Sequence, residues 1–194
     1  TSPPLLKGSL KSAIEHPEVK ILNCSLNTSH KYIRTYYARM YEAKFLMGAI
    51  AGALTENDRV GYLADYPIYG MTANINAFAL GAKMVNPRTK VYLEWTKLKG
   101  HDPFETFRSH EISYISGRDM ITPKLASRYF GLYWDGGGYP INLAMPVWHW
   151  GKFYEQMIRK VMKGSWKEDE VSDATRGLNY WWGMSAGAIE VICS

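Results

Sequence analysis

The chain has 194 residues, 46% of them hydrophobic, and a formal net charge of +5, so it can bury a sizeable core in one large domain or two small lobes. Its basic residues are scattered, and no RNA- or DNA-binding motif accompanies the densest group at residues 159–167, which favours a solvated helix face over nucleic-acid binding. The sequence has no run of 18 apolar residues, so no membrane span is predicted within this chain.

The N-terminal part predicts a short helix and two strands. The sequence starts Thr-Ser-Pro-Pro, which is typical of a linker, and we expect the chain to be cut from something longer. Ser9 suits the cap of a helix at Leu10–Glu15, which ends before Pro17. Apolar runs at Val19–Leu22 and Ile33–Tyr37 suit buried strands.

A long helix is predicted at Met40–Leu54, where the sequence is apolar nearly all round. Gly48 and Gly52 are four residues apart on this helix and therefore share a face. Such a face lets a helix approach a neighbouring backbone closely, so we expect tight core packing rather than dimerisation in a membrane.

The next stretch predicts a strand–helix–strand unit. Val60–Leu63 suits a buried strand, helical spacing begins near Asn74 and ends before the breaker pair at 86–87, and Lys90–Trp95 alternates as a second strand. The side chains expected to point inward from that second strand are Val91, Leu93 and Trp95. The connection Asp65–Gly70 is unusually aromatic, and it follows a strand end, where ligands bind in open α/β sheets. This pattern points toward small-molecule binding.

The second half of the chain predicts an alternation of loops, strands and helices. The expected elements are a polar loop at Lys97–Phe107, a strand at Ile112–Ser116, a short helix at Pro123–Gly131, a turn at Asp135–Gly138, a helix at Lys152–Lys163, and one or two strands in Asn179–Cys193.

No convincing catalytic set, cofactor site or metal site is predicted. Gly183–Gly187 matches the GxSxG pattern, but only seven residues follow it and none is a histidine, so we interpret it as a turn between two short strands. The sequence has no Gly-rich phosphate loop and no close histidine pair. Cys24 and Cys193 match no metal spacing, which indicates two buried or free thiols.

Several residues suit ligand binding instead. Asp119 follows a strand end and could accept hydrogen bonds from sugar hydroxyls, or it could cap the following turn or pair with Arg118. Trp148 and Trp150 would share a face in an extended segment and could stack on a planar ligand, or they could pack against the helix that follows. Tyr66 and Tyr69 lie in the aromatic connection, where one could line a cleft while the other packs.

At these residues the chain resembles the basic membrane protein family of substrate-binding lipoproteins, which includes purine-nucleoside receptors of ABC importers. The pieces that carry the resemblance, in the same order as in the family, are Tyr41–Thr55, Arg59–Gly70, Asn74–Pro87, Val91–Thr96, Asp102-Pro103, Pro146–Gln156 and Gly164–Lys167.

The resemblance implies an α/β fold of the type I periplasmic-binding-protein class, with two lobes that close on a ligand by hinge motion. Residues 1–57 would form a partial first lobe and a hinge crossing, 58–145 the second lobe, and 146–194 the hinge return with a C-terminal helix and strands. Two departures follow: the family's first strand and its Asp/Asn/Phe-rich loop are absent, and only about fifteen residues separate Asp102-Pro103 from Asp119, where the family has a longer insertion.

The resemblance also implies the site and the function. Asp119 carries over as the best ligand contact, whereas Tyr66, Asn74 and Trp148 carry over only by location. The implied function is that of an extracytoplasmic component of an ABC importer, which binds a nucleoside-like molecule without chemistry, is anchored to the membrane through a part not in this chain, and delivers the ligand to an ABC permease. The alternative is a regulatory or scaffold domain that uses the same fold for ligand sensing or protein contacts.

Overall fold

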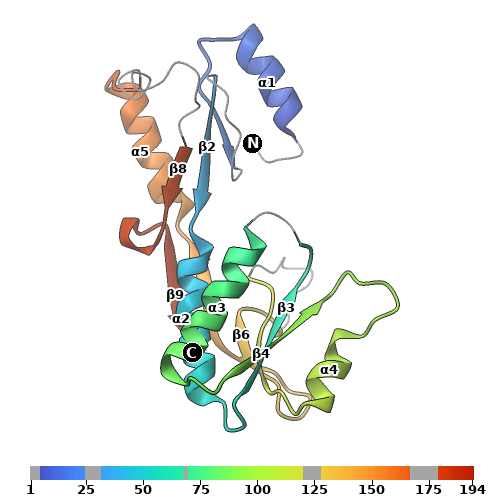
Figure 1. The fold of residues 1–194 in the computed structure, drawn as a ribbon. Helices are drawn as coiled ribbons and strands as arrows, with labels where there is room; N and C mark the ends of the chain where they lie inside the picture. Colours follow the sequence, from blue (N-terminus) through green and yellow to red (C-terminus); the bar gives the residue numbers. More distant parts are fainter. Residues whose placement is uncertain (1–4, 25–31, 68–69, 120–127, 167–178) are drawn as a thin grey trace. The chain divides into compact units, whose positions relative to one another are not determined.

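The computed structural model describes residues 5–24, 32–67, 70–119, 128–166 and 179–194. The chain divides into two compact units: unit 1 comprises Thr1–Arg39 and Trp148–Ile189, and unit 2 comprises Met40–Val147 and Glu190–Ser194. The chain therefore passes from one unit to the other three times (Figure 1). The predicted helix at Met40–Leu54 groups with unit 2, whereas the sequence-based division placed it in the segment that ends at residue 57.

Unit 1 is built on a three-stranded parallel sheet with the order β1-β2-β8. Its elements are α1 (Leu6–Glu15), β1 (Ile21–Cys24), β2 (Ile33–Ala38), α5 (Trp150–Met162), β8 (Asn179–Trp182) and a short 3-10 helix, η4 (Met184–Ala186). Helix α1 contacts β1 and β2. The apolar face of α5 packs Phe153 and Met157 against Tyr36 and Tyr180 of the sheet.

The first helix differs from the prediction. It begins at Leu6, so Ser9 lies inside it and does not cap it. The Ser9 hydroxyl is buried and donates a hydrogen bond of 2.9 Å to the carbonyl oxygen of Leu5, four residues earlier. This back-bonding satisfies the hydroxyl within the helix, and the predicted cap was therefore wrong.

Unit 2 contains a six-stranded sheet with the order β4-β3-β5-β6-β7-β9. The strands, in that order, are Lys90–Trp95, Arg59–Ala64, Tyr114–Ser116, Leu132–Trp134, Ile141–Trp148 and Ile189–Cys193. β4, β3 and β5 run parallel, whereas β6 pairs antiparallel with both β5 and β7. The predicted strand–helix–strand unit is confirmed, with α3 (Met71–Val85) between β3 and β4.

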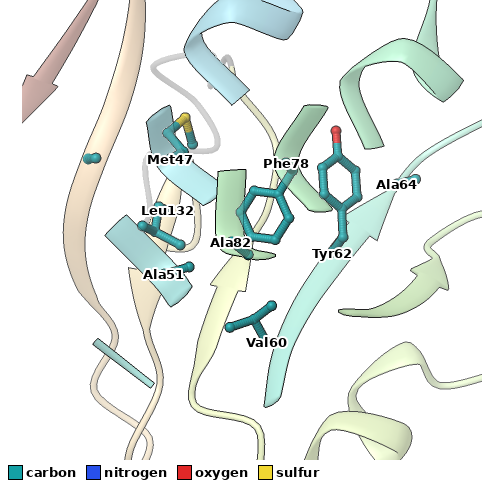
Figure 2. Packing of buried hydrophobic residues seen from close by; sticks show 9 residues of the cluster. Met47, Ala51, Val60, Tyr62, Ala64, Phe78, Ala82 and Leu132 are labelled. Carbon is teal, nitrogen blue, oxygen red and sulfur yellow. The ribbon is translucent and has the colours of Figure 1, made fainter. Parts of the chain in front are cut away.

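One face of this sheet is covered by α2 (Met40–Leu54) and α3, which pack tightly on each other. Figure 2 shows the core that they form with β3, in which Phe78 and Ala82 of α3 lie near Val60 and Tyr62. A Cβ atom added at Gly48 would overlap the carbonyl oxygen of Phe78. The predicted glycine face is thus confirmed as a close contact between two helix backbones.

The opposite face is covered by α4 (Pro103–Ser109), which places Phe107 against Ile115 and Tyr133. The polar loop predicted at Lys97–Phe107 was therefore wrong in its second half. Asp102 caps this helix, because its carboxylate accepts a hydrogen bond of 3.0 Å from the Phe104 backbone N–H. An Asp followed by Pro is a typical helix start, so the sequence contained the signal.

The inward alternation predicted for β4 holds only in part. Val91 and Trp95 pack against the core beneath α2 and α3, whereas Leu93 is exposed. The cause is that β4 is the edge strand, so the helices do not cover all of it.

The helix predicted at Pro123–Gly131 falls mostly outside the described residues, and Phe130 within it forms an isolated bridge with Arg118. Among the helices of the described residues, none has the length and hydropathy needed to cross a bilayer.

Substitution Gly48→Ala tests the contact between α2 and α3. The added methyl group must push the backbone at Phe78 away, so we expect the free energy of unfolding to fall by about 1–3 kcal/mol or more. The measurement is urea denaturation followed by circular dichroism. The matched control is Gly151→Ala in α5, where nothing lies within 4 Å of the added Cβ, and which should leave stability unchanged or raise it by up to about 1 kcal/mol. Equal stability of the two variants would contradict the packing described above.

Candidate functional site

The carboxyl ends of β3, β4 and β5 meet at one edge of the sheet of unit 2, because these neighbouring strands run parallel. We call this region the carboxyl edge. It consists of Asp65 and Tyr66 after β3, Thr96 after β4, and residues 117–119 after β5, together with Lys44, which reaches it from α2. In open α/β sheets this is the edge at which ligands bind.

The carboxyl edge is organised around Lys44, whose side chain is only 1% exposed. Its Nζ atom lies 2.5 Å from Oδ1 of Asp119 and donates hydrogen bonds to the Ser116 hydroxyl, at 2.9 Å, and to the Gly117 carbonyl oxygen, at 3.4 Å. The ammonium also lies 5.1 Å from the ring centroid of Tyr62. A buried charge is tolerated only when it is paired and hydrogen-bonded, and these contacts meet that requirement.

Asp119 therefore pairs with a buried lysine, and the alternative in which it pairs with Arg118 was wrong. Its side chain is 19% exposed, so part of it still reaches the surface. The prediction that Asp119 caps the turn after it lies outside the described residues, which do not include 120–127.

A second ion pair lies beside the first. The Arg118 guanidinium lies 3.4 Å from the Asp65 carboxylate, and the Thr96 hydroxyl donates a short hydrogen bond to the same carboxylate. These contacts tie the ends of β3, β4 and β5 together. Among its described residues, the carboxyl edge thus carries two cations and two carboxylates, and their charges balance.

A further pair of interacting side chains lies near the end of β4. Glu94 and His101 are joined by a contact of 2.5 Å between Oε2 and Nε2. Burial raises the pKa of the Glu94 carboxyl, but hydrogen bonds from Thr106 and His101 outweigh burial and hold that pKa below its ordinary value. This pair braces the loop that leads into α4.

The structure brings two of the predicted site residues to the carboxyl edge and leaves a third beside it. Asp119 and Tyr66 both lie on the edge, and Tyr66 is 53% exposed and available for contact. Asn74 is buried in the first turn of α3. This helix begins directly after Gly70, whose backbone is in the left-handed conformation. Tyr69, which shares the aromatic connection, lies outside the described residues.

The two predicted tryptophans belong to unit 1. Trp148 is the last residue of β7 and is half-buried, whereas Trp150 is the first residue of α5. Because the strand ends between them, they do not share the face of an extended segment, and that expectation was wrong. The Trp150 ring packs edge-on against Tyr36 of β2 at a centroid distance of 5.3 Å, so its partner is the sheet of unit 1 and not the following helix that the alternative named.

Sequence reasoning missed Lys44 and the pair formed by Asp65 and Arg118. Lys44 did leave a signal, since it is the one lysine in a helix that is otherwise apolar on its buried side, and lysine is almost never fully buried unless paired. The partner of each charge could not be found, because Lys44 and Asp119 are far apart in the sequence.

The other features of the described residues are weaker candidates for a functional site than the carboxyl edge. A cavity of about 420 Å³ lies between α4 and the β6–β7 turn, with walls that include Phe104, Phe107 and Tyr129. Its one arginine, Arg108, is already paired with Asp102 at 2.7 Å. The described residues contain no acid, histidine and cysteine cluster suited to a metal, and both cysteines are free thiols, as predicted.

The GxSxG segment is a turn, as predicted. It forms η4 and its flanking glycines between β8 and β9. The Ser185 hydroxyl accepts a hydrogen bond of 3.5 Å from Arg39, which is a contact that does not activate a nucleophile.

Comparison with known proteins gives one family and several relatives. A family model described as PnrA-like ABC transporter substrate-binding protein (Bmp) matches residues 13–128. A Haloferax volcanii protein named for glucose binding in an ABC transporter is 27% identical over 189 residues, a match that covers 90% of this chain and 46% of the relative. A purine-binding protein of Brucella abortus is 26% identical over 197 residues, covering 94% of this chain and 53% of the relative. The chain spans about half the length of these curated relatives.

Solved structures show the same fold at low sequence identity. An ABC transporter solute-binding protein from Conexibacter woesei matches with a TM-score of 0.58 at 13% identity, covering 96% of this chain and 65% of that one. One from Aeropyrum pernix matches with a TM-score of 0.56 at 15% identity, covering 97% and 58%. A transcriptional activator of the comK gene from Bacillus halodurans matches with a TM-score of 0.63 at 13% identity, covering 97% and 72%. The predicted α/β fold of this class is confirmed.

Substitution Asp119→Asn tests the buried pair. It removes the charge that compensates the Lys44 ammonium, which is 1% exposed, so we expect the free energy of unfolding to fall by roughly 1–3 kcal/mol. The control is Arg118→Gln, which breaks an ion pair whose partners are 44% and 35% exposed and should cost less than about 1 kcal/mol. Both are measured by urea denaturation, and a smaller loss for Asp119→Asn than for the control would refute the assignment.

Proposed function

This chain belongs to the family of PnrA-like ABC transporter substrate-binding proteins, and we propose that its carboxyl edge binds a neutral, hydroxyl-bearing small molecule of the nucleoside or sugar type. Membership confirms the resemblance to the basic membrane protein family inferred from the sequence. Members of this family bind their substrates and do not transform them, which agrees with the absence of a catalytic set in the sequence.

The observation that carries the proposal is the charge balance of the carboxyl edge. Both cations that the structure describes there have a carboxylate partner, at 2.5 Å for Lys44 and 3.4 Å for Arg118. A charged ligand would lose hydration without finding an unpaired opposite charge, and that loss is costly. A hydroxyl group, by contrast, can donate to the partly exposed Asp119 carboxylate, and such a charge-assisted hydrogen bond is strong.

The relatives support the same class of ligand. One is named for purine binding and the other for glucose binding. A nucleoside joins a base to a sugar that bears hydroxyl groups, so it combines the features of both. Tyr66, exposed beside Asp65, offers a ring on which a base could stack.

We further propose the cellular context that this ligand implies. The protein would work on the outer side of the cytoplasmic membrane, held there by a lipid anchor beyond residues 1–194, and would deliver its ligand to an ABC permease. These statements rest on the family and on the two curated relatives, and the chain spans about half the length of each relative.

A thermal-shift titration of the full-length protein tests the ligand class. The panel is adenosine, guanosine, inosine, ribose and glucose, with adenosine monophosphate as the charged counterpart of adenosine. A ligand at about one hundred times its dissociation constant should stabilise the protein by about 2.7 kcal/mol. We expect a neutral member of the panel to raise the melting temperature, adenosine monophosphate to raise it less than adenosine, and Asp119→Asn to abolish the shift.

The control for this titration is Arg88→Gln. Arg88 is 81% exposed and pairs with Asp58 at the amino end of β4, away from the carboxyl edge, so its replacement should leave the ligand-induced shift unchanged. A panel without any shift, or a shift that survives in Asp119→Asn, contradicts the proposal. The second candidate, a regulatory domain, shares its fold with the Bacillus halodurans activator and would then be tested by capture of a protein partner.

A further inference from the structure

We propose that Lys44 is a positioning residue, which fixes the Asp119 carboxylate so that it accepts hydrogen bonds from ligand hydroxyl groups. The inference rests on the proposed function, because it assigns a role to Lys44 in the same site. Lys44 would act through Asp119 and would not touch the ligand itself.

The contacts of the ammonium group explain why Lys44 acts indirectly. An ammonium has three N–H donors. Within 3.4 Å of Nζ the structure places three acceptors, which are Oδ1 of Asp119, the Ser116 hydroxyl and the Gly117 carbonyl oxygen. With one ion pair and two hydrogen bonds around its ammonium and only 1% of its side chain exposed, Lys44 has no surface area for a ligand.

The two oxygens of the Asp119 carboxylate differ in their surroundings. Oδ1 is buried and lies 2.5 Å from Nζ of Lys44. The side chain as a whole nevertheless keeps 19% of its surface exposed, and this exposure belongs to atoms other than Oδ1. Lys44 therefore holds Oδ1, and the proposal assigns the contact with a ligand to the other oxygen, Oδ2.

The anchor of this arrangement is rigid. Lys44 lies on α2, whose backbone is locked against α3 at Gly48 and Gly52. The Ser116 and Gly117 acceptors fix the same ammonium to the end of β5. A group held by its packing and by hydrogen bonds pays little entropy on binding, which raises affinity and selectivity.

The neighbouring ion pair of the carboxyl edge differs from the pair of Lys44 and Asp119 because its cation is not buried. Arg118 and Asp65 lie 3.4 Å apart, and their side chains are 44% and 35% exposed. Water competes for such a pair and several geometries are open to it. Asp65 is therefore less well placed to select a ligand by the position of its hydroxyls.

The test is the selectivity of the full-length protein for hydroxyl groups, measured by calorimetry with two matched pairs: adenosine with 2′,3′-dideoxyadenosine, and glucose with 2-deoxyglucose. The wild-type protein should prefer the hydroxylated member of one pair by about tenfold or more, since hydrogen bonds to charged groups are strong. In Lys44→Met this preference should fall toward one, as it does in Asp119→Asn. Lys44→Arg, which keeps the charge, should recover part of it.

The control separates positioning from stability. Met47→Ala removes a fully buried side chain from the same helix, so it should destabilise the protein about as much as Lys44→Met but keep the wild-type preference. If Lys44→Met keeps the preference while Asp119→Asn loses it, Lys44 is structural only and the proposed function stands. If the wild-type protein binds no member of either pair, the proposed function and this inference both fall.

Discussion

The need to bury the charge of Lys44 constrains unit 2 more than any other single interaction. An ammonium that is 1% exposed must find a carboxylate and polar acceptors, and it finds all of them at the end of β5. This requirement fixes how closely α2 approaches the sheet and which face of the helix is turned toward it. The close approach of α2 and α3 through their glycines makes that placement possible, so packing and electrostatics support the same geometry.

The carboxyl edge follows from this constraint. Because β3, β4 and β5 are parallel neighbours, the groups that follow them converge, and the loops there are free to carry polar residues. The Asp65 carboxylate joins the three strand ends through Arg118 and Thr96. Asp119 is held by its ion pair with Lys44 of α2. Among the described residues the result is a balanced set of charges beside the partly exposed Asp119 side chain, and on this balance we base the proposal that the edge recognises hydroxyl groups rather than ions.

Elements with a strong local pattern could be predicted from the sequence. The period of apolar residues located α2, β3 and α3, and the glycine spacing indicated the contact of α2 with another helix. Helix α4 was missed because the polar character of its surroundings outweighed the Asp102-Pro103 start signal. The family pieces indicated the fold, and the comparisons confirm it.

The site was harder to predict, because it depends on contacts between distant parts of the chain. Asp119 was singled out from its place after a strand, but its partner Lys44 lies on a helix much earlier in the chain, and local patterns do not report such distant pairs. Trp148 and Trp150 would share a face only in an extended segment, whereas β7 ends at Trp148 and α5 begins at Trp150. Tertiary structure decides these points.

The most direct test of the central claim is a crystal structure of the full-length protein with adenosine bound. We predict that a ribose hydroxyl lies within hydrogen-bonding distance of the Asp119 carboxylate while Lys44 keeps its contact with Oδ1. Adenosine bound elsewhere, for example in the cavity beside α4, with Asp119 contacting protein groups alone, would contradict the assignment of the carboxyl edge as the binding site.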